Sequence, residues 1–314
     1  MTVASIDMGT NTILLLIAKV NLESDKIKTL ENFYRIPRIG KGLLPGNPIP
    51  DENIKRMFGV LDEYSEIINK YGCEKILVTG TNAFRIASNT STIIEKIKEK
   101  FGYELNVVPG KDEAKLSYLG VTEDYYGHKN LLVIDIGGGS TEISHGTDSN
   151  IHFSKSYPVG VVSLTEKLFK SDPPSIENVN NFIEYLQDFI NNVSDNAGEI
   201  DTGIAIAGTP TTLACIKLNL KDYNEELVEG STLSKEELNN FVKELSKLNS
   251  KDIVQKYSTV VKGREDVLLA GTIILSEIVN RLNLPEIKVS TKGIRYGAIV
   301  NWINSLSLLT DSFL

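Results

Sequence analysis

A short stretch that occurs twice constrains this chain more than any other feature. In "VIDIGGGSTE" an apolar run ends in Asp135, three glycines, two hydroxyl residues and a second carboxylate. Almost the same pattern stands near the N-terminus as "ASIDMGTNT", where Asp7 and Gly9 follow the apolar run as Asp135 and Gly137 do. Two such copies rarely arise by chance. We therefore expect two related lobes, each headed by a strand, a glycine turn and a return strand.

Glycine turns of this kind suit phosphate groups. Without a Cβ the backbone N–H groups can approach an anion, and Ser or Thr hydroxyls add further donors. We expect two opposed turns to grip one phosphate chain. The residues assigned to this role are Gly9, Thr10, Asn11 and Thr12 in the first turn and Gly137, Gly138, Gly139, Ser140 and Thr141 in the second. Each turn alone could equally be an ordinary tight turn.

The carboxylates beside these turns predict a cation. A carboxylate repels a phosphate unless positive charge lies between them, and Mg²⁺ prefers one or two carboxylates together with waters and phosphate oxygens. Asp7 and Asp135 stand at the strand ends, and Glu142 follows the second turn. We expect these three side chains to hold Mg²⁺.

Further segments could also meet an anion. In "GIAIAGTPTTLACI", Gly208 and Thr209 open a helix whose N–H groups and dipole favour phosphate, although ordinary N-capping explains the pattern equally well. Loop cations are the other candidates, and each alone is more often a solvated surface charge. They are Arg38, Lys41, Arg85, Lys111, Arg264, Lys292 and Arg295.

Five short apolar segments indicate buried strands that end in a glycine-containing turn. They are "TVASIDMG", "KILVTGT", "LLVIDIGGG", "GIAIAGTP" and "IKVSTKG". The last three are followed by residues that can start a helix. After the first segment, "ILLLIAKV" predicts the return strand of a hairpin. The pattern is typical of α/β layering with loops gathered at the strand ends.

Three amphipathic helices are predicted between these strands. The first has Asp51 as its N-cap, and the second follows Ser175 as one continuous helix. The third opens at Ser234, which forms a capping box with Glu237. A last helix is expected in "RYGAIVNWINSLSLL".

Length and composition narrow the class of protein. At 314 residues with 41% apolar content, the chain is long enough for two compact domains. A net charge of −8 disfavours nucleic-acid binding through clustered Lys and Arg. No segment reaches the ~20 apolar residues of a membrane span and no signal peptide is present, so we expect a soluble cytoplasmic protein. Cys73 and Cys215 are expected to be buried free thiols, and His128, His145 and His152 to be surface or loop residues.

The chain shows no pattern for covalent catalysis. It has neither a Walker-type "GxxxxGK[ST]" nor a Ser-His-Asp arrangement, so a phosphoryl reaction would use water and a carboxylate or histidine base. "PGKDEAKL" brings Asp112 and Glu113 to the end of a predicted strand. Composition does not choose between these two carboxylates.

Nine stretches, taken in order, resemble one known family over nearly the whole chain. They are "SIDMGTNT", "RIGKGL", "GTNAFRIASN", "GKDEAKLSYLGV", "VIDIGGGSTE", "PVGVVSLTE", "IAGTPTTLA", "GRED" and "VSTKGIRYG". The family is that of the exopolyphosphatases and guanosine pentaphosphate phosphohydrolases. The resemblance implies an actin-like α/β fold of two ribonuclease H-like lobes around an interdomain cleft, with a possible homodimer. The first lobe would span 1–123 together with a C-terminal helix at about 297–314, and the second 124–296.

The resemblance also implies an activity and roles for residues. The expected reaction is hydrolysis of the terminal phosphoanhydride of inorganic polyphosphate or of guanosine pentaphosphate. The family's general base corresponds to Glu113, and Arg85 corresponds to an arginine that neutralises phosphate. Two alternatives on the same fold are an ATP-dependent small-molecule kinase and an actin-like or Hsp70-like ATPase.

Four residues depart from the family pattern. Ile13 and Leu14 stand where the family often has Arg or His, Ser163 replaces an Arg, and Tyr296 replaces a Glu. These departures are expected to bear on the choice of substrate more than on the reaction.

Overall fold

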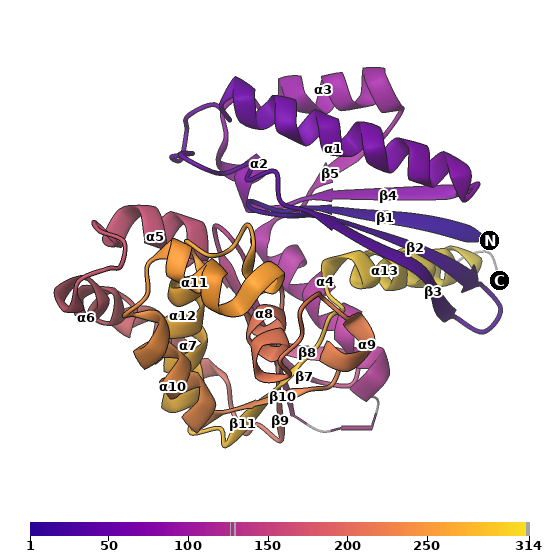
Figure 1. The fold of residues 1–314 in the computed structure, drawn as a ribbon. Coiled ribbons are helices and arrows are strands. Elements are labelled where there is room, and N and C mark those ends of the chain that lie inside the picture. Colours follow the sequence, from indigo (N-terminus) through magenta and orange to yellow (C-terminus); the bar gives the residue numbers. More distant parts are fainter. Residues whose placement is uncertain (126, 129, 312–314) are drawn as a thin grey trace. The chain divides into compact units, whose positions relative to one another are not determined.

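The computed structural model describes residues 1–125, 127–128 and 130–311, without the side chains of 123 and 307–311. The chain forms two compact units (Figure 1). The first comprises Met1–Val121 and the chain from Gly293 onward, and the second comprises Thr122–Lys292. The first unit is therefore discontinuous in sequence. The boundaries expected from the sequence, after residues 123 and 296, stay a prediction about the domains.

A five-stranded mixed sheet organises the first unit, in the order β3-β2-β1-β4-β5. β1 and β2 form an antiparallel hairpin, β3 pairs antiparallel with β2, and β4 and β5 continue parallel to β1. Its strands are β1 (Thr2–Met8), β2 (Ile13–Asn21), β3 (Lys26–Arg35), β4 (Lys75–Gly80) and β5 (Leu105–Val107). Its helices are α1 (Asp51–Lys70), α2 (Asn82–Ile86), α3 (Thr90–Phe101), α4 (Gly110–Thr122) and α13 (Ile294–Asp311).

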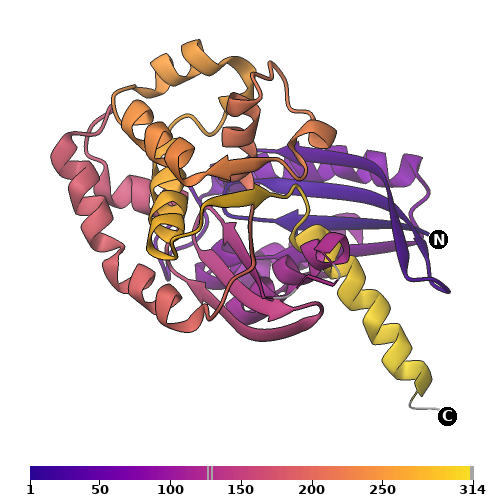
Figure 2. The same ribbon diagram turned by 90° about the horizontal axis from the view of Figure 1, so that it is seen from below.

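The period-2 pattern of β1 and β2 divides the core of the first unit between two faces. Ala4, Ile6 and Met8 pack with residues of α1 and α3, whereas Val3 packs with Ile299 of α13. Figures 1 and 2 show α1 and α3 on one face of this sheet and α13 on the other. The side chain of Asp7 belongs to the same alternate set as Val3.

A six-stranded sheet organises the second unit, in the order β10-β11-β9-β6-β7-β8. Its strands are β6 (Leu131–Ile136), β7 (Thr141–Thr147), β8 (Asn150–Tyr157), β9 (Thr202–Ile206), β10 (Thr232–Ser234) and β11 (Glu286–Val289). Its helices are α5 (Val161–Leu168), α6 (Ile176–Tyr185), α7 (Gln187–Asn196), α8 (Gly208–Lys217), α9 (Glu225–Val228), α10 (Lys235–Leu245), α11 (Ser250–Tyr257) and α12 (Leu268–Arg281), with 3-10 helices η1 (Glu123–Tyr125) and η2 (Ser258–Val261). α12 is apolar and almost wholly buried, so the other helices pack around it.

The two sheets repeat one arrangement, which confirms the duplication expected from the sequence. β6 and β7 form an antiparallel hairpin as β1 and β2 do, β8 corresponds to β3, and β9 lies parallel to β6 as β4 does to β1. The predicted hairpin of "VASIDMG" with "ILLLIAKV" is present. The expectation of a helix after "LLVIDIGGG" is wrong, because the residues after its glycines enter β7 and pair with β6.

Two of the helix predictions need correction. The N-cap of α1 is Pro50, and Asp51 is the first helical residue, where a carboxylate also suits the helix dipole. The helix after Ser175 is interrupted at Leu186, which separates α6 from α7. The sequence conceals this break because the apolar stripe continues across it. The capping box of Ser234 with Glu237 is confirmed.

The histidine and cysteine expectations hold only in part. His145 is buried in β7, and its Nε2 lies 2.9 Å from the carbonyl oxygen of Glu199, so its expected surface position is wrong. His128 and His152 are exposed. Both cysteines are free, but only Cys215 is buried, since Cys73 follows α1 at a partly exposed position.

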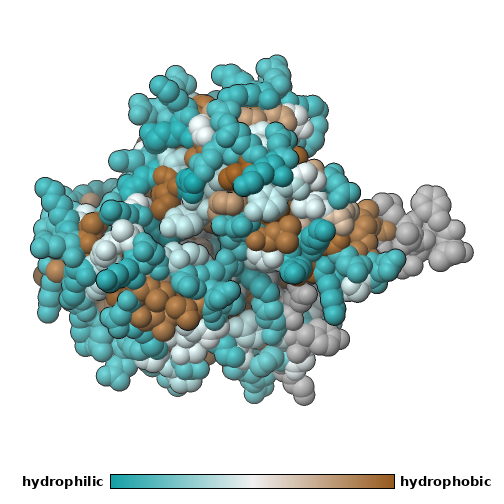
Figure 3. Space-filling model, turned by 45° about the vertical axis from the view of Figure 1, so that its right-hand side comes forward, coloured by the Kyte–Doolittle hydropathy of each residue, from teal (hydrophilic) through white to brown (hydrophobic). Residues whose placement is uncertain are grey.

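One face of the described chain is mainly polar. The face drawn in Figure 3 is covered mostly by hydrophilic side chains, with separate apolar areas between them. No helix of the described residues is long and apolar enough to cross a membrane.

Candidate active site

The two glycine turns have nearly the same backbone. In the first, the N–H of Gly9 donates to the carbonyl of Thr12 at 3.0 Å, and in the second the N–H of Gly137 donates to the carbonyl of Ser140 at 2.9 Å. A Cβ on either glycine would lie 3.1 or 3.0 Å from that carbonyl oxygen, closer than an ordinary contact. A side chain at either position would require that carbonyl to shift by a few tenths of an ångström, so both turns favour glycine as the first residue.

Helix α5 braces the second turn from outside. The N–H groups of Val161 and Val162 donate to the carbonyls of Gly137 and Gly138 at 3.0 and 2.8 Å. This contact depends on Gly160, because a Cβ there would lie 2.3 Å from the carbonyl carbon of Gly139. The first N–H groups of α5 are therefore used within the fold.

Thr141 braces the same turn from inside. Its hydroxyl is fully buried and donates to the carbonyl of Val159 at 2.5 Å. Ser140 is also buried. The phosphate-binding role expected for Thr141 stays a prediction, and its hydroxyl proton already has a protein acceptor.

Two carboxylates lie opposite each other beside the second turn. Asp135 on β6 pairs in register with Glu142 on β7, so both side chains are on the same face of the sheet. Both are buried, and Glu142 accepts a hydrogen bond from Ser156 Oγ at 2.6 Å. Like charges directly opposite each other are destabilising unless a cation or proton lies between them.

These residues fit a hard divalent cation. Carboxylate oxygens are ligands that Mg²⁺ takes in ones and twos while it keeps several waters. Within the described part of the chain no group of three or more His, Cys, Asp and Glu side chains could hold a metal ion by itself. The donor set of Asp135 and Glu142 is thus one that substrate oxygens and water would complete.

The first turn has a different surrounding. Asp7 is buried at the end of β1, and its register partners are Leu14 on β2 and Thr79 on β4. No carboxylate stands where Glu142 stands in the second unit. The first turn is instead covered by the loop after β3, as its backbone hydrogen bonds show.

The backbone of the loop of residues 36–43 lies against the first turn. The N–H of Arg38 donates to the carbonyl of Asn11 at 3.0 Å, and the N–H of Gly40 donates to that of Thr10 at 2.7 Å. Buried Asn53 of α1 donates to the carbonyls of Ile39 and Lys41 at 2.9 Å each, which holds the loop in place. The backbone at Arg38 and Lys41 is thereby held in the loop beside the turn, a placement that the sequence did not reveal.

Glu113 and Arg85 are in direct contact in the first unit. Glu113 lies in the first turn of α4 and is buried, whereas its neighbour Asp112 is exposed. Arg85 in α2 donates from Nη1 to Glu113 Oε2 and, at 3.1 Å, to the carbonyl of Val108. Two residues with separate expected roles, base and phosphate ligand, thus form one ion pair.

A third anion candidate lies at the start of α8. Gly208 begins this helix, and the Arg264 guanidinium rests against it, since a Cβ on Gly208 would lie 2.6 Å from Arg264 Nε. Thr209 is buried where Gly271 of α12 leaves room for its hydroxyl. Arg264 Nη1 also lies 3.4 Å from Thr212 Oγ1.

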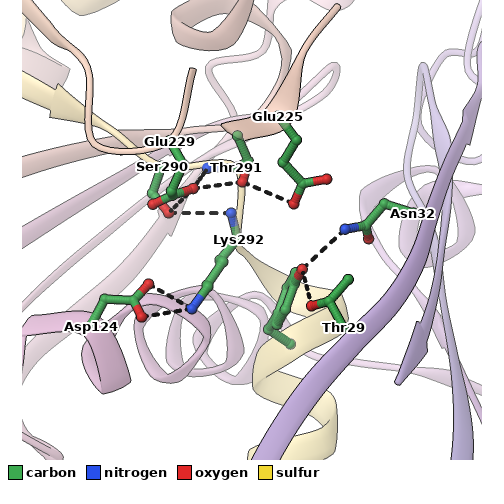
Figure 4. A network of polar contacts seen from close by, with 9 residues as sticks. Thr29, Asn32, Asp124, Glu225, Glu229, Ser290, Thr291 and Lys292 are labelled. Carbon is green, nitrogen blue, oxygen red and sulfur yellow. Dashed lines mark hydrogen bonds and ion pairs between the residues drawn. The ribbon is translucent and has the colours of Figure 1, made fainter. Parts of the chain in front are cut away.

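Lys292 forms an ion pair within the second unit. Figure 4 shows its Nζ paired with both carboxylate oxygens of Asp124, at 2.6 and 2.7 Å. In the same network Glu229 accepts hydrogen bonds from Ser290 Oγ and from the N–H and hydroxyl of Thr291. The segment that follows β11 is therefore fixed to α9 and to the chain after α4.

Tyr296 makes a structural contact. Its buried hydroxyl accepts a hydrogen bond from Asn32 Nδ2 at 3.1 Å and lies 3.0 Å from Thr29 Oγ1, both on β3 (Figure 4). Arg295, beside it in α13, is buried as well. Tyr296 attaches α13 to the first sheet.

Three curated relatives are similar to this chain. A bifunctional 3-dehydroquinate synthase/phosphatase of Fusobacterium nucleatum is 30% identical over 96% of the chain and 46% of the relative. A guanosine-5'-triphosphate,3'-diphosphate pyrophosphatase of Photobacterium profundum is 25% identical over 96% of the chain and 59% of the relative. Exopolyphosphatase 2 of Mycobacterium tuberculosis is 30% identical over 89% of the chain and 90% of the relative. The chain thus spans about half the length of the first two.

A solved structure and a family model agree with these relatives. The structure of the Aquifex aeolicus member of the Ppx/GppA protein family has a TM-score of 0.83 and 29% identity, covering 97% of this chain and 98% of that one. The model described as the Ppx/GppA phosphatase family matches residues 16–306. With its paired glycine turns on two related sheets, the chain belongs to the Ppx/GppA phosphatase family.

Proposed function

We propose that this chain hydrolyses the terminal phosphoanhydride of inorganic polyphosphate and releases orthophosphate. The observation that carries the proposal is the buried Glu113 in contact with Arg85, in a member of a phosphatase family. A buried carboxylate suits proton abstraction from water, and an arginine beside it suits a phosphoryl group. The relative named an exopolyphosphatase supports the choice of polyphosphate.

In the proposed reaction, a water oxygen forms a bond to the terminal phosphorus while the bridging P–O bond breaks. Glu113 takes a proton from that water, and the shortened chain leaves with the electron pair of the broken bond. Apart from those of Gly9 and Gly137, which donate within the turns, the N–H groups of the glycine turns donate to the phosphate oxygens and bind the chain. Asp7, Asp135 and Glu142 would hold Mg²⁺, which supplies neutralisation of phosphate charge when bound.

The test is phosphate release from polyphosphate with Mg²⁺ by the Glu113→Gln variant. Removal of a general base is expected to lower kcat by about 10²- to 10⁴-fold. Asp112→Asn is the matched control, because this neighbouring carboxylate is exposed and should leave kcat unchanged. Near-normal phosphate release by Glu113→Gln would show that the base is assigned wrongly.

Guanosine pentaphosphate is the second proposed substrate. The relative named a guanosine-5'-triphosphate,3'-diphosphate pyrophosphatase supports it. Orthophosphate release from the two substrates at equal concentration, with the same enzyme preparation, ranks them. If neither substrate yields orthophosphate and ATP is consumed only when a sugar or carboxylate acceptor is added, the chain is a kinase and the proposed hydrolysis is wrong.

A further inference from the structure

Arg85 makes all of its side-chain contacts through one nitrogen. Nη1 donates both to the carbonyl of Val108 and to Glu113 Oε2. Among the residues that the structure describes, Nε and Nη2 of Arg85 have no hydrogen-bond or ion-pair partner. The side chain of Arg85 is 20% exposed and that of Glu113 only 6%. One edge of the guanidinium is thus used within the protein, and the other, here called the open edge, has no hydrogen-bond or ion-pair partner in the described part of the chain.

The open edge has the geometry that binds phosphate best. The guanidinium is planar, and the N–H groups of Nε and of Nη2 point in parallel, so they can donate to two oxygens of one phosphate. The Nη1 hydrogens lie in the same rigid plane but point away from the Nε–Nη2 edge. A phosphate bound at the open edge would not have to displace Glu113.

The sheet places this edge among the other anion candidates of the first unit. β1, β4 and β5 run parallel, so the chain leaves all three at the same end of the sheet. The first glycine turn follows β1, α2 with Arg85 follows β4, and α4 with Glu113 follows β5. Through its contact with Glu113, Arg85 therefore links α2 to α4, two of the three segments at this end of the sheet. β4, which precedes α2, pairs directly with β1, which precedes the first glycine turn.

We propose that Arg85 is a bridge between substrate and base. Its Nε–Nη2 edge binds two oxygens of a phosphoryl group, while its Nη1 positions the Glu113 carboxylate relative to that group. The guanidinium group of Arg85 then both binds the phosphate and orients the base. This role rests on the proposed function, and it makes Arg85 a positioning residue as well as a phosphate ligand.

The experiment is a double-mutant cycle with Arg85→Lys and Glu113→Gln. Lysine keeps the charge but cannot donate in two directions from a plane. With Glu113 present, Arg85→Lys is expected to lower kcat by about 100-fold, as misplacement of a reacting group does. In the Glu113→Gln background the same change should leave kcat almost unaltered, while KM still rises. Equal losses of kcat in both backgrounds would overturn the bridge.

Two further variants separate this role from simple support of the fold. Arg35→Lys is the matched control, because Arg35 also donates to a backbone carbonyl, that of Tyr34, and to a carboxylate, that of Glu63. It should leave both kcat and KM unchanged. Added guanidinium ion should restore part of the phosphate release lost by Arg85→Ala, and absence of any rescue while the variant remains folded by circular dichroism counts against the bridge.

The proposed role of Arg85 can also be tested if the proposed function is wrong. If the unaltered protein releases no phosphate from polyphosphate or guanosine pentaphosphate, the same cycle is measured as the dissociation constant of tripolyphosphate by calorimetry. The bridge predicts that the effect of Arg85→Lys on binding depends on whether Glu113 is present. An effect that is the same in both backgrounds, or no binding by the unaltered protein, overturns it.

Discussion

The two glycine turns show how a duplicated backbone can carry different chemistry. Each turn closes with the same hydrogen bond and follows a buried aspartate. Opposite Asp135 stands Glu142, whereas opposite Asp7 stands Leu14. The second unit thus carries a carboxylate pair. The first unit has Arg38 and Lys41 in the loop beside its turn. It also has the contact of Arg85 with Glu113, which lies in the helix that follows β5.

The prediction with the largest expected effect compares the packing that supports each of the two turns. A Cβ at Gly160 would meet the backbone of Gly139, whereas a Cβ at Gly40 would lie 2.2 Å from the Thr10 methyl carbon Cγ2, a side-chain atom. Gly160→Ala is expected to lower the free energy of unfolding by about 3 kcal/mol, at the upper end of overpacking costs. Gly40→Ala should cost about 1–2 kcal/mol, and adding Thr10→Ser, which removes that methyl, should recover most of it.

Urea unfolding can assign each loss to a unit. Trp302 is the sole tryptophan and lies in α13, so its fluorescence reports the first unit, while circular dichroism reports both. Gly40→Ala should shift the unfolding transition seen by fluorescence to lower urea concentration. Gly160→Ala should shift the part of the circular dichroism transition that does not coincide with the fluorescence change. Full stability of Gly160→Ala would mean that α5 does not brace the second turn.

The next prediction concerns the carboxylate present in only one unit. Glu142→Gln should raise the Mg²⁺ concentration for half-maximal phosphate release by about 10- to 100-fold, because one ligand oxygen loses its charge. Leu14→Met at the equivalent position of the first unit should not change this concentration. Glu184→Gln on exposed α6 is the control for charge alone. An unchanged Mg²⁺ requirement in Glu142→Gln removes this residue from the cation site.

The smallest expected effect lies far from both turns and tests whether the units respond separately. Burial raises the pKa of Glu237, but hydrogen bonds from Lys217 and the Ser234 N–H outweigh it and leave the pKa below its usual value of 4.5. A lowered carboxyl pKa stabilises the folded state above about pH 4.5, and this part is lost as the pH falls through the lowered pKa.

Glu237→Gln should therefore cost about 0.5 kcal/mol at pH 7 and less at pH 3.5, since the carboxyl is about one-third exposed. The measurement is the urea midpoint by circular dichroism at both pH values. The Trp302 transition should not move, because Glu237 belongs to the second unit. A cost that grows on acidification would contradict the lowered pKa.

The repeated turns were predictable because both their glycines and their flanking apolar runs are local in sequence. Strand, turn and return strand follow from such patterns, and so does the capping box at Ser234. His145 was misjudged, because a lone polar residue in a strand does not reveal that a carbonyl of another segment will accept its hydrogen bond.

The contacts of the candidate site were less accessible from the sequence. Arg85 and Glu113 were each singled out by family resemblance, but their pairing depends on β4 and β5 being neighbours in the sheet. The position of Arg38 beside the first turn depends on backbone hydrogen bonds between distant segments. Catalytic and metal-binding roles, the homodimer and the cytoplasmic location stay predictions.

The discontinuity of the first unit affects how the protein is made. Val3, Leu16 and Val20 are covered by Ile299 and Ile303 of α13, which are synthesised only after the whole second unit. The second unit is one continuous segment and can close its core while those residues are still being synthesised. The strands translated first must therefore wait, with one apolar face uncovered, until α13 has been synthesised.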